Sequence, residues 1–295
     1  MANDIINKCI DIFDTYFFDN QLCGYNYKTQ KGQIKQIDIK YVNNHLLITI
    51  VGTISELPNL EHLCVRLNCL HVKYGICLSV NKKNNSVVAG GNLKYIYGIK
   101  QIENFEHDIK SYVSSFSFLQ INDNIKEQIY NQISNIVTGN VVLDAYSGRG
   151  VLSAIMSKKA KKVISIEISQ DAVNDAIYML ATNGITNVDC LCGDFEILVD
   201  EILEKIDSVI LDPPRKGINE KALNKILEIS PSKIIYLSCA SNTLARDLKV
   251  LLKDNNYNIK LVQPFDMFPN CNDVETLVVL EKVNDKRQKT TKKEK

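Results

Sequence analysis

A cysteine and a glutamate in the last quarter of the chain have the surroundings needed for nucleophilic attack and proton removal. Cys239 follows an apolar run at 234–237 and precedes a predicted helix, whose N-terminus favours a thiolate. Glu275 lies at the start of the run 274–281, and a carboxylate in a closed apolar site can act as a base near neutral pH. A thiolate that adds to carbon 6 of uracil makes carbon 5 reactive, and a base must then remove the carbon 5 proton. The pair is therefore suited to covalent chemistry at a pyrimidine ring.

A turn that contains an acid and two prolines follows another apolar run. The segment Asp212-Pro213-Pro214-Arg215 comes directly after the predicted strand 208–211. The prolines end the strand and stiffen the turn, so that Asp212 projects into a cleft at the edge of the sheet. Comparable turns occur in methyltransferases that act on planar nitrogens, and a plain structural turn is the alternative. The turn alone leaves the methyl acceptor open.

A glycine-rich loop predicts a nucleotide site. The predicted strand 141–144 runs into residues 145–150 (AYSGRG), where Gly148 lets the backbone approach a ligand closely. Glu167 ends the next strand, where an acid can hold two ribose hydroxyls, although a solvated carboxylate is the alternative. Asp194 follows the third strand and could reach an adenine amino group or cap a helix. Either a dinucleotide or S-adenosylmethionine fits these three positions.

The order of the predicted elements favours S-adenosylmethionine. Strands separated by helix-length segments indicate a doubly wound, mostly parallel sheet; they are predicted at 141–146, 162–167, 188–192, 208–211 and 234–237. The last two strands, 257–265 and 274–281, are joined by a short loop, which predicts an antiparallel hairpin. A dinucleotide fold would continue with a second nucleotide-binding half. The α/β fold expected here is therefore a class I (Rossmann-like) S-adenosylmethionine methyltransferase domain.

Three regions are expected along the chain. Residues 1–116 are expected to form a small α+β domain, with a helix at 4–18 and a hairpin of strands 34–42 and 45–51. Residues 117–282 form the catalytic domain, and 283–295 a basic disordered tail. From Lys282 to Lys295 there are seven Lys/Arg and two Asp/Glu, although the whole chain has a net charge of +1. A solvated tail and a nucleic-acid contact both explain that composition.

Taken together, these motifs resemble the RNA 5-methyluridine (uracil-C5) methyltransferase family, in its bacterial 23S rRNA branch. The matching stretches are 118–122 (FLQIN), 144–150, 212–217, 238–247 and 266–275. The resemblance implies that Cys239 is the nucleophile and Glu275 the proton acceptor. The residues expected around S-adenosylmethionine are Gln120, Tyr146, Gly148, Glu167, Asp194 and Asp212.

The implied activity is methyl transfer to carbon 5 of a uridine in RNA through a covalent adduct between cysteine and carbon 6, with the α+β domain of residues 1–116 framing the RNA cleft. Ribosomal 23S RNA is the favoured substrate, and the alternatives are the same chemistry on tRNA or a weakly active or non-catalytic RNA-binding factor. Departures from the family pattern keep the last alternative open: Ala240-Ser241 replaces Asn-Pro, Ser147 and Arg149 alter the glycine loop, and residues 270–273 lack two histidines.

Composition sets further expectations. Hydrophobic residues make up 45% and charged residues 23%, as in globular proteins, and no apolar run reaches the roughly 18 residues of a membrane helix. Nine cysteines without a C-x-x-C pair or an export signal indicate reduced thiols in the cytoplasm. We expect a monomer without a metal. We expect this protein to lack the four-cysteine iron–sulfur motif and the small N-terminal β-barrel RNA-binding domain of longer family members.

Overall fold

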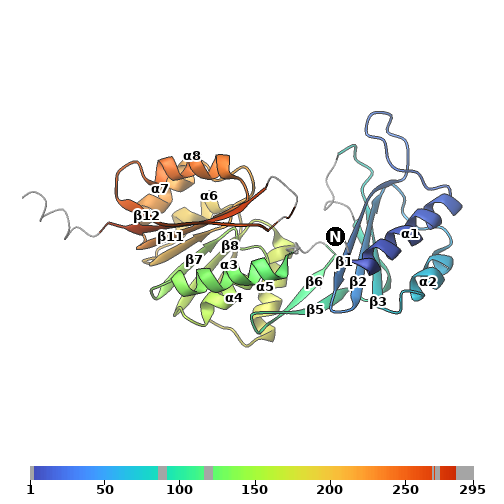
Figure 1. Ribbon diagram of the computed structural model, residues 1–295, viewed down its shortest axis with the longest axis horizontal. Helices are drawn as coiled ribbons and strands as arrows, with labels where there is room; N and C mark the ends of the chain where they lie inside the picture. Colours follow the sequence, from blue (N-terminus) through green and yellow to red (C-terminus); the bar gives the residue numbers. More distant parts are fainter. Residues whose placement is uncertain (1–2, 86–91, 116–121, 268, 270–272, 284–295) are drawn as a thin grey trace, which may run out of the picture. The chain divides into compact units, whose positions relative to one another are not determined.

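The structure is a computed structural model that describes residues 3–85, 92–115, 122–267, 269 and 273–283 (Figure 1). The predicted cofactor residue Gln120 and residues 284–295 of the predicted basic tail lie outside this range. The chain divides into two compact units. One comprises Met1–Asn104 and Tyr112–Ser117, and the other comprises Phe105–Ser111 and Phe118–Lys295.

The first unit packs two helices on a four-stranded sheet. The helices are α1 (Asp4–Asp19) and α2 (Leu60–Asn68), and the strands are β1 (Ile34–Val42), β2 (His45–Gly52), β3 (Lys73–Val80) and β4 (Asn92–Gly98) in the order β1-β2-β3-β4. Only the β2–β3 pair is parallel. Phe13 of α1, Leu63 of α2 and Ile48 of β2 are buried in one hydrophobic cluster, so both helices cover the same face of the sheet. The predicted β1–β2 hairpin is present.

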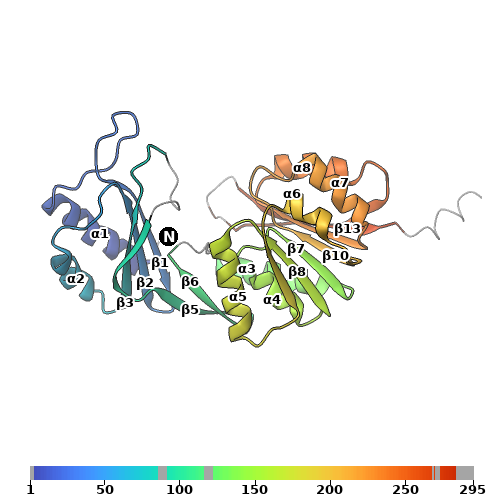
Figure 2. The ribbon, with the colours of Figure 1, turned by 180° about the vertical axis from the view of Figure 1, so that it is seen from behind.

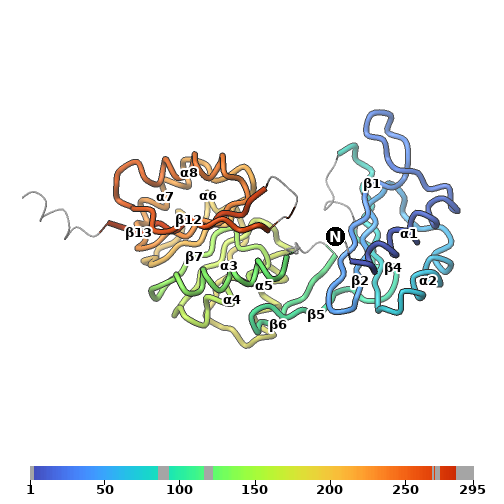
Figure 3. The backbone as a smooth tube through the Cα atoms, in the orientation of Figure 1, coloured from blue at the N-terminus to red at the C-terminus, as the bar shows by residue number. Residues whose placement is uncertain are grey.

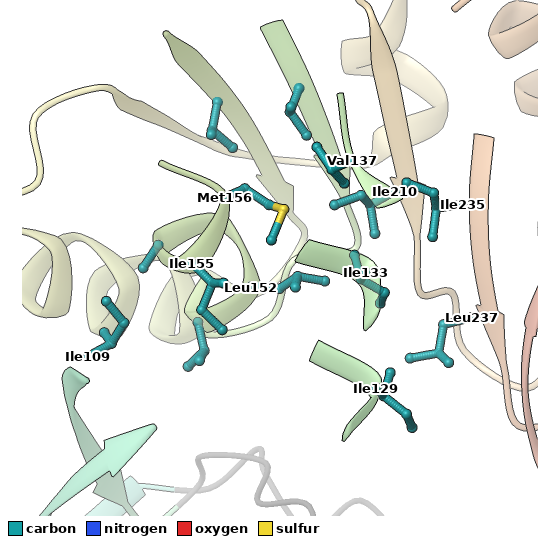
Figure 4. Packing of buried hydrophobic residues seen from close by; sticks show 14 of the residues in the cluster. Ile109, Ile129, Ile133, Val137, Leu152, Ile155, Met156, Ile210, Ile235 and Leu237 are labelled. Atoms are coloured by element: carbon teal, nitrogen blue, oxygen red, sulfur yellow. The ribbon is translucent and has the colours of Figure 1, made fainter. Parts of the chain in front are cut away.

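A two-stranded ribbon, β5 (Gln101–Glu106) and β6 (Ile109–Ser114), follows β4 and was not predicted. Its turn residues, His107 and Asp108, both have positive φ (51° and 63°). Ile109 beyond the turn packs in the core of the second unit (Figure 4). The expected domain boundary between residues 116 and 117 stays a prediction, and residues 105–111 belong to the second unit.

The second unit is built on a seven-stranded sheet in the order β12-β13-β11-β10-β7-β8-β9. Its strands are β7 (Val141–Ala145), β8 (Lys162–Glu167), β9 (Val188–Cys192), β10 (Ser208–Leu211), β11 (Lys233–Ser238), β12 (Tyr257–Phe265) and β13 (Glu275–Lys282). β13 lies antiparallel between β11 and β12, whereas the pairs from β11 to β9 are parallel. The trace in Figure 3 follows the chain through this sheet. The predicted parallel sheet with a terminal antiparallel hairpin is confirmed.

Helices cover both faces of this sheet (Figure 2). One face carries α3 (Asp123–Ile136), α4 (Val151–Ser157) and α5 (Gln170–Thr182), and the other carries α6 (Phe195–Leu198), α7 (Glu220–Ile229) and α8 (Ser241–Leu251). Figure 4 shows the first of these cores, where Ile133 and Met156 from the helices pack near Ile210 of β10. Because apolar layers lie on both sides, the ligand sites of such a sheet lie at the carboxyl ends of its strands, where the strand order reverses between β10 and β7.

Candidate active site

The strand register brings most of the predicted residues to one edge of the seven-stranded sheet. Ala145 of β7 lies opposite Leu211 of β10 and Ile166 of β8. The next residues along these parallel strands, Tyr146, Asp212 and Glu167, therefore emerge at the same edge. This edge is the one predicted from the strand-end positions of these residues.

The glycine loop is held by the end of β8. The backbone N–H of Gly148 donates to Glu167 Oε2 at 2.9 Å, and the N–H of Ser169 donates to Glu167 Oε1 at 2.8 Å. Gly148 has φ +55°, and a Cβ there would meet no heavy atom within 4 Å. The loop therefore needs a residue that tolerates positive φ, and it leaves open space beside its backbone for a ligand.

Tyr146 and Asp194 also lie near one another. Tyr146 has φ 62°, and its ring centroid lies 5.3 Å from that of Phe195. Burial, followed by the carboxylates of Glu196 and Asp194, raises the pKa of Tyr146. Asp194 is the N-cap of α6, since its Oδ1 accepts the backbone N–H of Glu196 at 2.9 Å. The capping alternative is thus observed, and a contact of Asp194 with adenine stays a prediction.

Arg149, which departs from the family's loop pattern, is held by a buried ion-pair cluster that the sequence did not reveal. Its Nη2 lies 3.2 Å from Glu106 Oε1, and Lys126 Nζ of α3 lies 2.8 Å from Glu106 Oε2. The side chains of Glu106 and Lys126 are only 4% and 7% exposed. Burial opposes ionisation of Glu106, yet the cations of Lys126 and Arg149 outweigh it and lower its pKa. The glycine loop is therefore anchored to the β5–β6 ribbon and to α3.

Cys239 and Glu275 leave neighbouring strands side by side. Ser238 of β11 lies opposite Thr276 of the antiparallel strand β13, so one further step along each chain reaches Cys239 and Glu275. Glu275 is 3% exposed, and burial raises its pKa to about 7, although Arg215 opposes this shift. Cys239 is partly buried. Its thiol pKa is raised, first by burial and then by the charge of Glu275, which is opposite to the direction expected from a helix N-terminus alone.

The helix that follows Cys239 begins without a side-chain cap. Ala240 is the N-cap of α8 and has the extended backbone (φ −134°, ψ 100°) that a capping residue adopts. Its methyl group accepts no hydrogen bond, although Thr243 Oγ1 donates to the Ala240 carbonyl at 3.1 Å. With alanine in place of the family's asparagine, the residue next to Cys239 offers no side-chain cap to α8.

Asp212 and Arg215 place an acidic and a basic side chain in the same turn. Asp212 is exposed, yet desolvation by the surrounding protein, followed by the charges of Glu275 and Asp144, raises its pKa to about 8. Arg215 Nη2 forms an ion pair with Asp273 Oδ2 at 2.6 Å, and Arg215 also interacts with Cys239, whose pKa it lowers. Sequence reasoning gave Arg215 no role of its own.

The turn that carries Asp212 is fixed to α8 by a buried acid. Asp247 is fully buried, and its Oδ2 accepts the N–H of Ile218 at 2.9 Å and the hydroxyl of Tyr236 at 2.7 Å. Arg246 Nη2 donates to the carbonyl of Lys216 at 3.0 Å. Arg246 and Asp247 both lie in the stretch 238–247 that resembles the family, but only the structure reveals that they anchor the turn.

The described residues contain neither a cluster of metal ligands nor a membrane-spanning helix. Within that part of the chain, no group of three or more His, Cys, Asp or Glu side chains could hold a metal ion. None of the helices in the same ranges is long and apolar enough to cross a membrane.

Fold and site together define a class I S-adenosylmethionine-dependent methyltransferase fold. The chain belongs to the tRNA (uracil-5-)-methyltransferase family, whose sequence model matches residues 92–283. The predicted family is thereby confirmed at this level.

Several known proteins are similar to this chain. An uncharacterised RNA methyltransferase of Bacillus cereus is 33% identical over 274 residues, which cover 89% of this chain and 59% of that protein. One from Listeria innocua is 36% identical over 265 residues, 87% of this chain and 58% of that protein. This chain thus spans less than two thirds of the length of these relatives. Among solved structures, the Pyrococcus abyssi tRNA (uracil-54, C5)-methyltransferase in complex with S-adenosyl-L-homocysteine has a TM-score of 0.77 at 23% identity. The match covers 92% of this chain and 66% of the Pyrococcus abyssi chain.

Proposed function

We propose that this protein transfers a methyl group from S-adenosylmethionine to carbon 5 of a uridine in RNA. The observation that carries the proposal is the placement of Cys239 beside Glu275, with Asp212 and Arg215 close enough to shift their pKa values. A thiol and a carboxyl group with a pKa of about 7 at one sheet edge match the nucleophile and base that this reaction needs.

The glycine-loop half of the edge would hold the cofactor. The open space at Gly148, the carboxylate of Glu167 and the ring of Tyr146 fit a nucleoside, with Asp194, Asp212 and Gln120 as further contacts. When bound, S-adenosylmethionine supplies an electrophilic methyl group. The residues of the loop bind and orient it; they take no part in the proton transfers.

The chain's own groups carry the acceptor chemistry. The Cys239 thiol loses its proton to solvent, and its sulfur forms a bond to carbon 6 of uracil, which leaves an enolate whose carbon 5 can take the methyl group. Glu275 then removes the proton from carbon 5. The double bond between carbons 5 and 6 re-forms as the bond to sulfur breaks. Arg215 supports the first step because its charge lowers the pKa of the thiol.

The RNA itself is proposed from similarity. The sequence motifs favour 23S rRNA, whereas the name of the Pyrococcus abyssi structure supports tRNA as the second candidate. A weakly active RNA-binding factor is a third candidate, favoured by the uncapped start of α8 and the raised pKa of the Cys239 thiol.

Methylation of unmodified 23S rRNA and tRNA transcripts, followed by nuclease digestion and mass spectrometry, tests the proposal. We expect 5-methyluridine in the 23S rRNA arm. Its appearance in the tRNA arm alone would select the second candidate. Tight RNA binding without any methylated nucleoside would select the third, and methylation of another base atom would overturn the proposal.

A further inference from the structure

Two loops of the first unit lie at the same end of its sheet. Ile34 at the start of β1 lies opposite Gly52, which lies opposite Val80 at the end of β3. The loop 22–33, which enters β1, and the loop 81–85, which leaves β3, therefore project from one end, as the blue and teal segments of Figure 1 show. We call residues 22–33 and 81–85 the basic loops.

The two basic loops contain four lysines and no acidic residue. Residues 20–37 contain three lysines and no Asp or Glu, and residues 72–102 contain five lysines and no Asp or Glu. The ion pairs among the described residues of this unit join Lys40 to Asp38 and Arg66 to Asp19. The exposed lysines of the basic loops, which take no part in them, are Lys28, Lys31, Lys82 and Lys83.

Two tyrosines stand among these lysines. The ring centroids of Tyr25 and Tyr27 lie 5.2 Å apart with an interplanar angle of 81°, and Tyr27 is 43% exposed. Lys35 Nζ lies 4.7 Å from the Tyr25 centroid and 5.9 Å from that of Tyr27. Unstacked bases bind to aromatic rings of this kind, and neighbouring cations hold the phosphates between them.

Hydrogen bonds tie the two basic loops together. Lys35 Nζ donates to the carbonyl of Lys83, the Tyr25 hydroxyl donates to Asn84 Oδ1 at 3.4 Å, and Asn84 Nδ2 donates to the Tyr27 carbonyl at 3.3 Å. Within the first loop, Asn26 Oδ1 accepts the N–H groups of Lys28 and Thr29 at 2.9 and 3.0 Å. The loops that carry the lysines and tyrosines are thus held in a defined arrangement, which reduces the ordering cost of binding.

A glycine enforces the path of the first loop. Gly32 has φ +101°, and a Cβ at this position would lie 2.2 Å from the carbonyl oxygen of Gly24. Only glycine allows the backbone at position 32 to approach the backbone of Gly24 so closely. The path of the loop therefore depends on this glycine.

We propose that the basic loops form a docking surface for single-stranded RNA, with phosphates on the four exposed lysines and a base against Tyr27. The proposal rests on the proposed function, because that function makes RNA the polyanion that this protein meets. A stacked duplex offers no free base face to a tyrosine, so a single strand fits this surface better than a helix.

Fluorescence anisotropy with a labelled, uridine-containing single-stranded RNA of about 15 nucleotides tests the docking surface. The variant K28Q/K31Q/K82Q/K83Q should bind about 10- to 100-fold more weakly, and the slope of log affinity against log salt should fall by about 2 to 3, since each phosphate contact contributes roughly 0.7. The matched control K161Q/K205Q/K249Q/K253Q changes the same charge on exposed lysines of the second unit and should retain the wild-type slope. Equal slopes for wild type and the loop variant would overturn the proposal.

Substitutions at Tyr27 distinguish the contribution of base stacking to RNA affinity from the contribution of charge. Tyr27→Ala should weaken RNA binding by about 5- to 100-fold without changing the salt slope, while Tyr27→Phe should stay within about twofold of wild type. Equal affinity for Tyr27→Ala would remove the aromatic part of the surface. Displacement of the RNA by polyglutamate at the same charge concentration would contradict RNA as the occupant.

A methylation assay distinguishes this inference from the function on which it rests. The loop variant should raise the KM for RNA and leave kcat near the wild-type value. If wild type methylates RNA while the loop variant has an unchanged KM, the docking surface is wrong and the proposed function stands. If wild type makes no 5-methyluridine but the loop variant loses RNA affinity, the docking surface stands and the function is wrong.

Discussion

The sheet edge that carries the candidate site has a glycine-loop half, around Glu167 and Asp194, and an acceptor half, around Asp212 and Glu275. The two halves differ in how their charged groups are stabilised. In the glycine-loop half, Glu167 accepts two backbone N–H groups and Asp194 caps a helix. In the acceptor half, desolvation raises the pKa of Asp212 to about 8 and that of Glu275 to about 7, and the charge of Glu275 adds to the shift of Asp212. The first half is therefore arranged by interactions that also stabilise the fold, whereas the second holds groups that the fold alone does not favour.

This difference indicates where function has shaped the sequence. A carboxyl group whose pKa is raised lowers the stability of the folded protein when it is ionised, and such groups persist where chemistry uses them. Arg215 provides the compensating charge, since it lowers the pKa of both Glu275 and Cys239. The raised pKa values in the acceptor half thus suit proton transfer. The hydrogen bonds in the glycine-loop half hold its backbone in one conformation.

The largest effect expected is on catalysis, and it should be confined to the acceptor half. Cys239→Ala should reduce methyl transfer by at least about a thousand-fold, as the loss of a covalent nucleophile does, while RNA and cofactor still bind. Cys192→Ala, at an exposed cysteine of β9, is the matched control and should keep full activity. A Cys239→Ala protein with the wild-type rate would require another acceptor mechanism.

The stability of the acceptor half should depend on pH. Because the pKa of Glu275 is raised from 4.5 to about 7 in the folded state, the folded protein binds this proton more tightly than the unfolded chain. Stability should therefore fall as pH rises from about 4.5 to 7, and Glu275→Gln should stabilise the protein at pH 8 by up to about 3 kcal/mol and little at pH 4.5. Urea denaturation at both pH values measures this difference.

A variant of the glycine-loop half provides the contrast. Glu167→Gln should destabilise the protein at both pH values, because it replaces an acceptor of two backbone N–H groups. If the stability change for Glu275→Gln is the same at both pH values, the two halves do not differ as described.

The affinity for S-adenosylmethionine tests directly whether the glycine-loop half binds the cofactor. Glu167→Gln should weaken S-adenosylmethionine by about 10- to 100-fold, because a hydrogen bond to a charged group contributes about 1.5–3 kcal/mol. Asp194→Asn keeps the helix cap, so unchanged affinity would assign Asp194 to capping and reduced affinity would assign it to the cofactor. Calorimetry that shows full affinity for Glu167→Gln would remove Glu167 from the site.

The smallest effect concerns the uncapped helix beside Cys239. Ala240→Asn should restore a side-chain acceptor at the N-cap of α8 and raise the free energy of unfolding by about 1 kcal/mol. Ser169→Ala, which removes an observed cap from α5, should lower it by a similar amount. Chemical denaturation of both variants checks the pair, and an unchanged value for Ala240→Asn would show that the site cannot accommodate the cap.

Much of the fold of the second unit could be predicted because the sequence patterns that indicate it lie within short segments. Apolar strands alternate with helices, and Glu167, Asp212 and Cys239 follow strand ends, so a parallel sheet must bring them to one edge. The β12–β13 hairpin was predicted from the short loop between its strands.

What was missed depends on tertiary contacts. Glu106 and Arg149 lie 43 residues apart, and neither segment signals the other. The β5–β6 ribbon turns at His107-Asp108 without the Asn-Gly or Gly pairs that mark tight hairpins. The pKa of Cys239 was expected to fall from its place before a helix, but burial and the charge of Glu275 on another strand raise it.

In the proposed mechanism, Cys239 attacks before methyl transfer and Glu275 removes a proton after it. Denaturing electrophoresis of Glu275→Gln, incubated with RNA and methyl-labelled S-adenosylmethionine, tests this order. We expect a protein–RNA adduct that carries the labelled methyl group, because the bond to sulfur cannot break until the carbon 5 proton has left. The double variant Cys239→Ala/Glu275→Gln should form none. Normal turnover by Glu275→Gln, or an adduct in the double variant, would contradict the account.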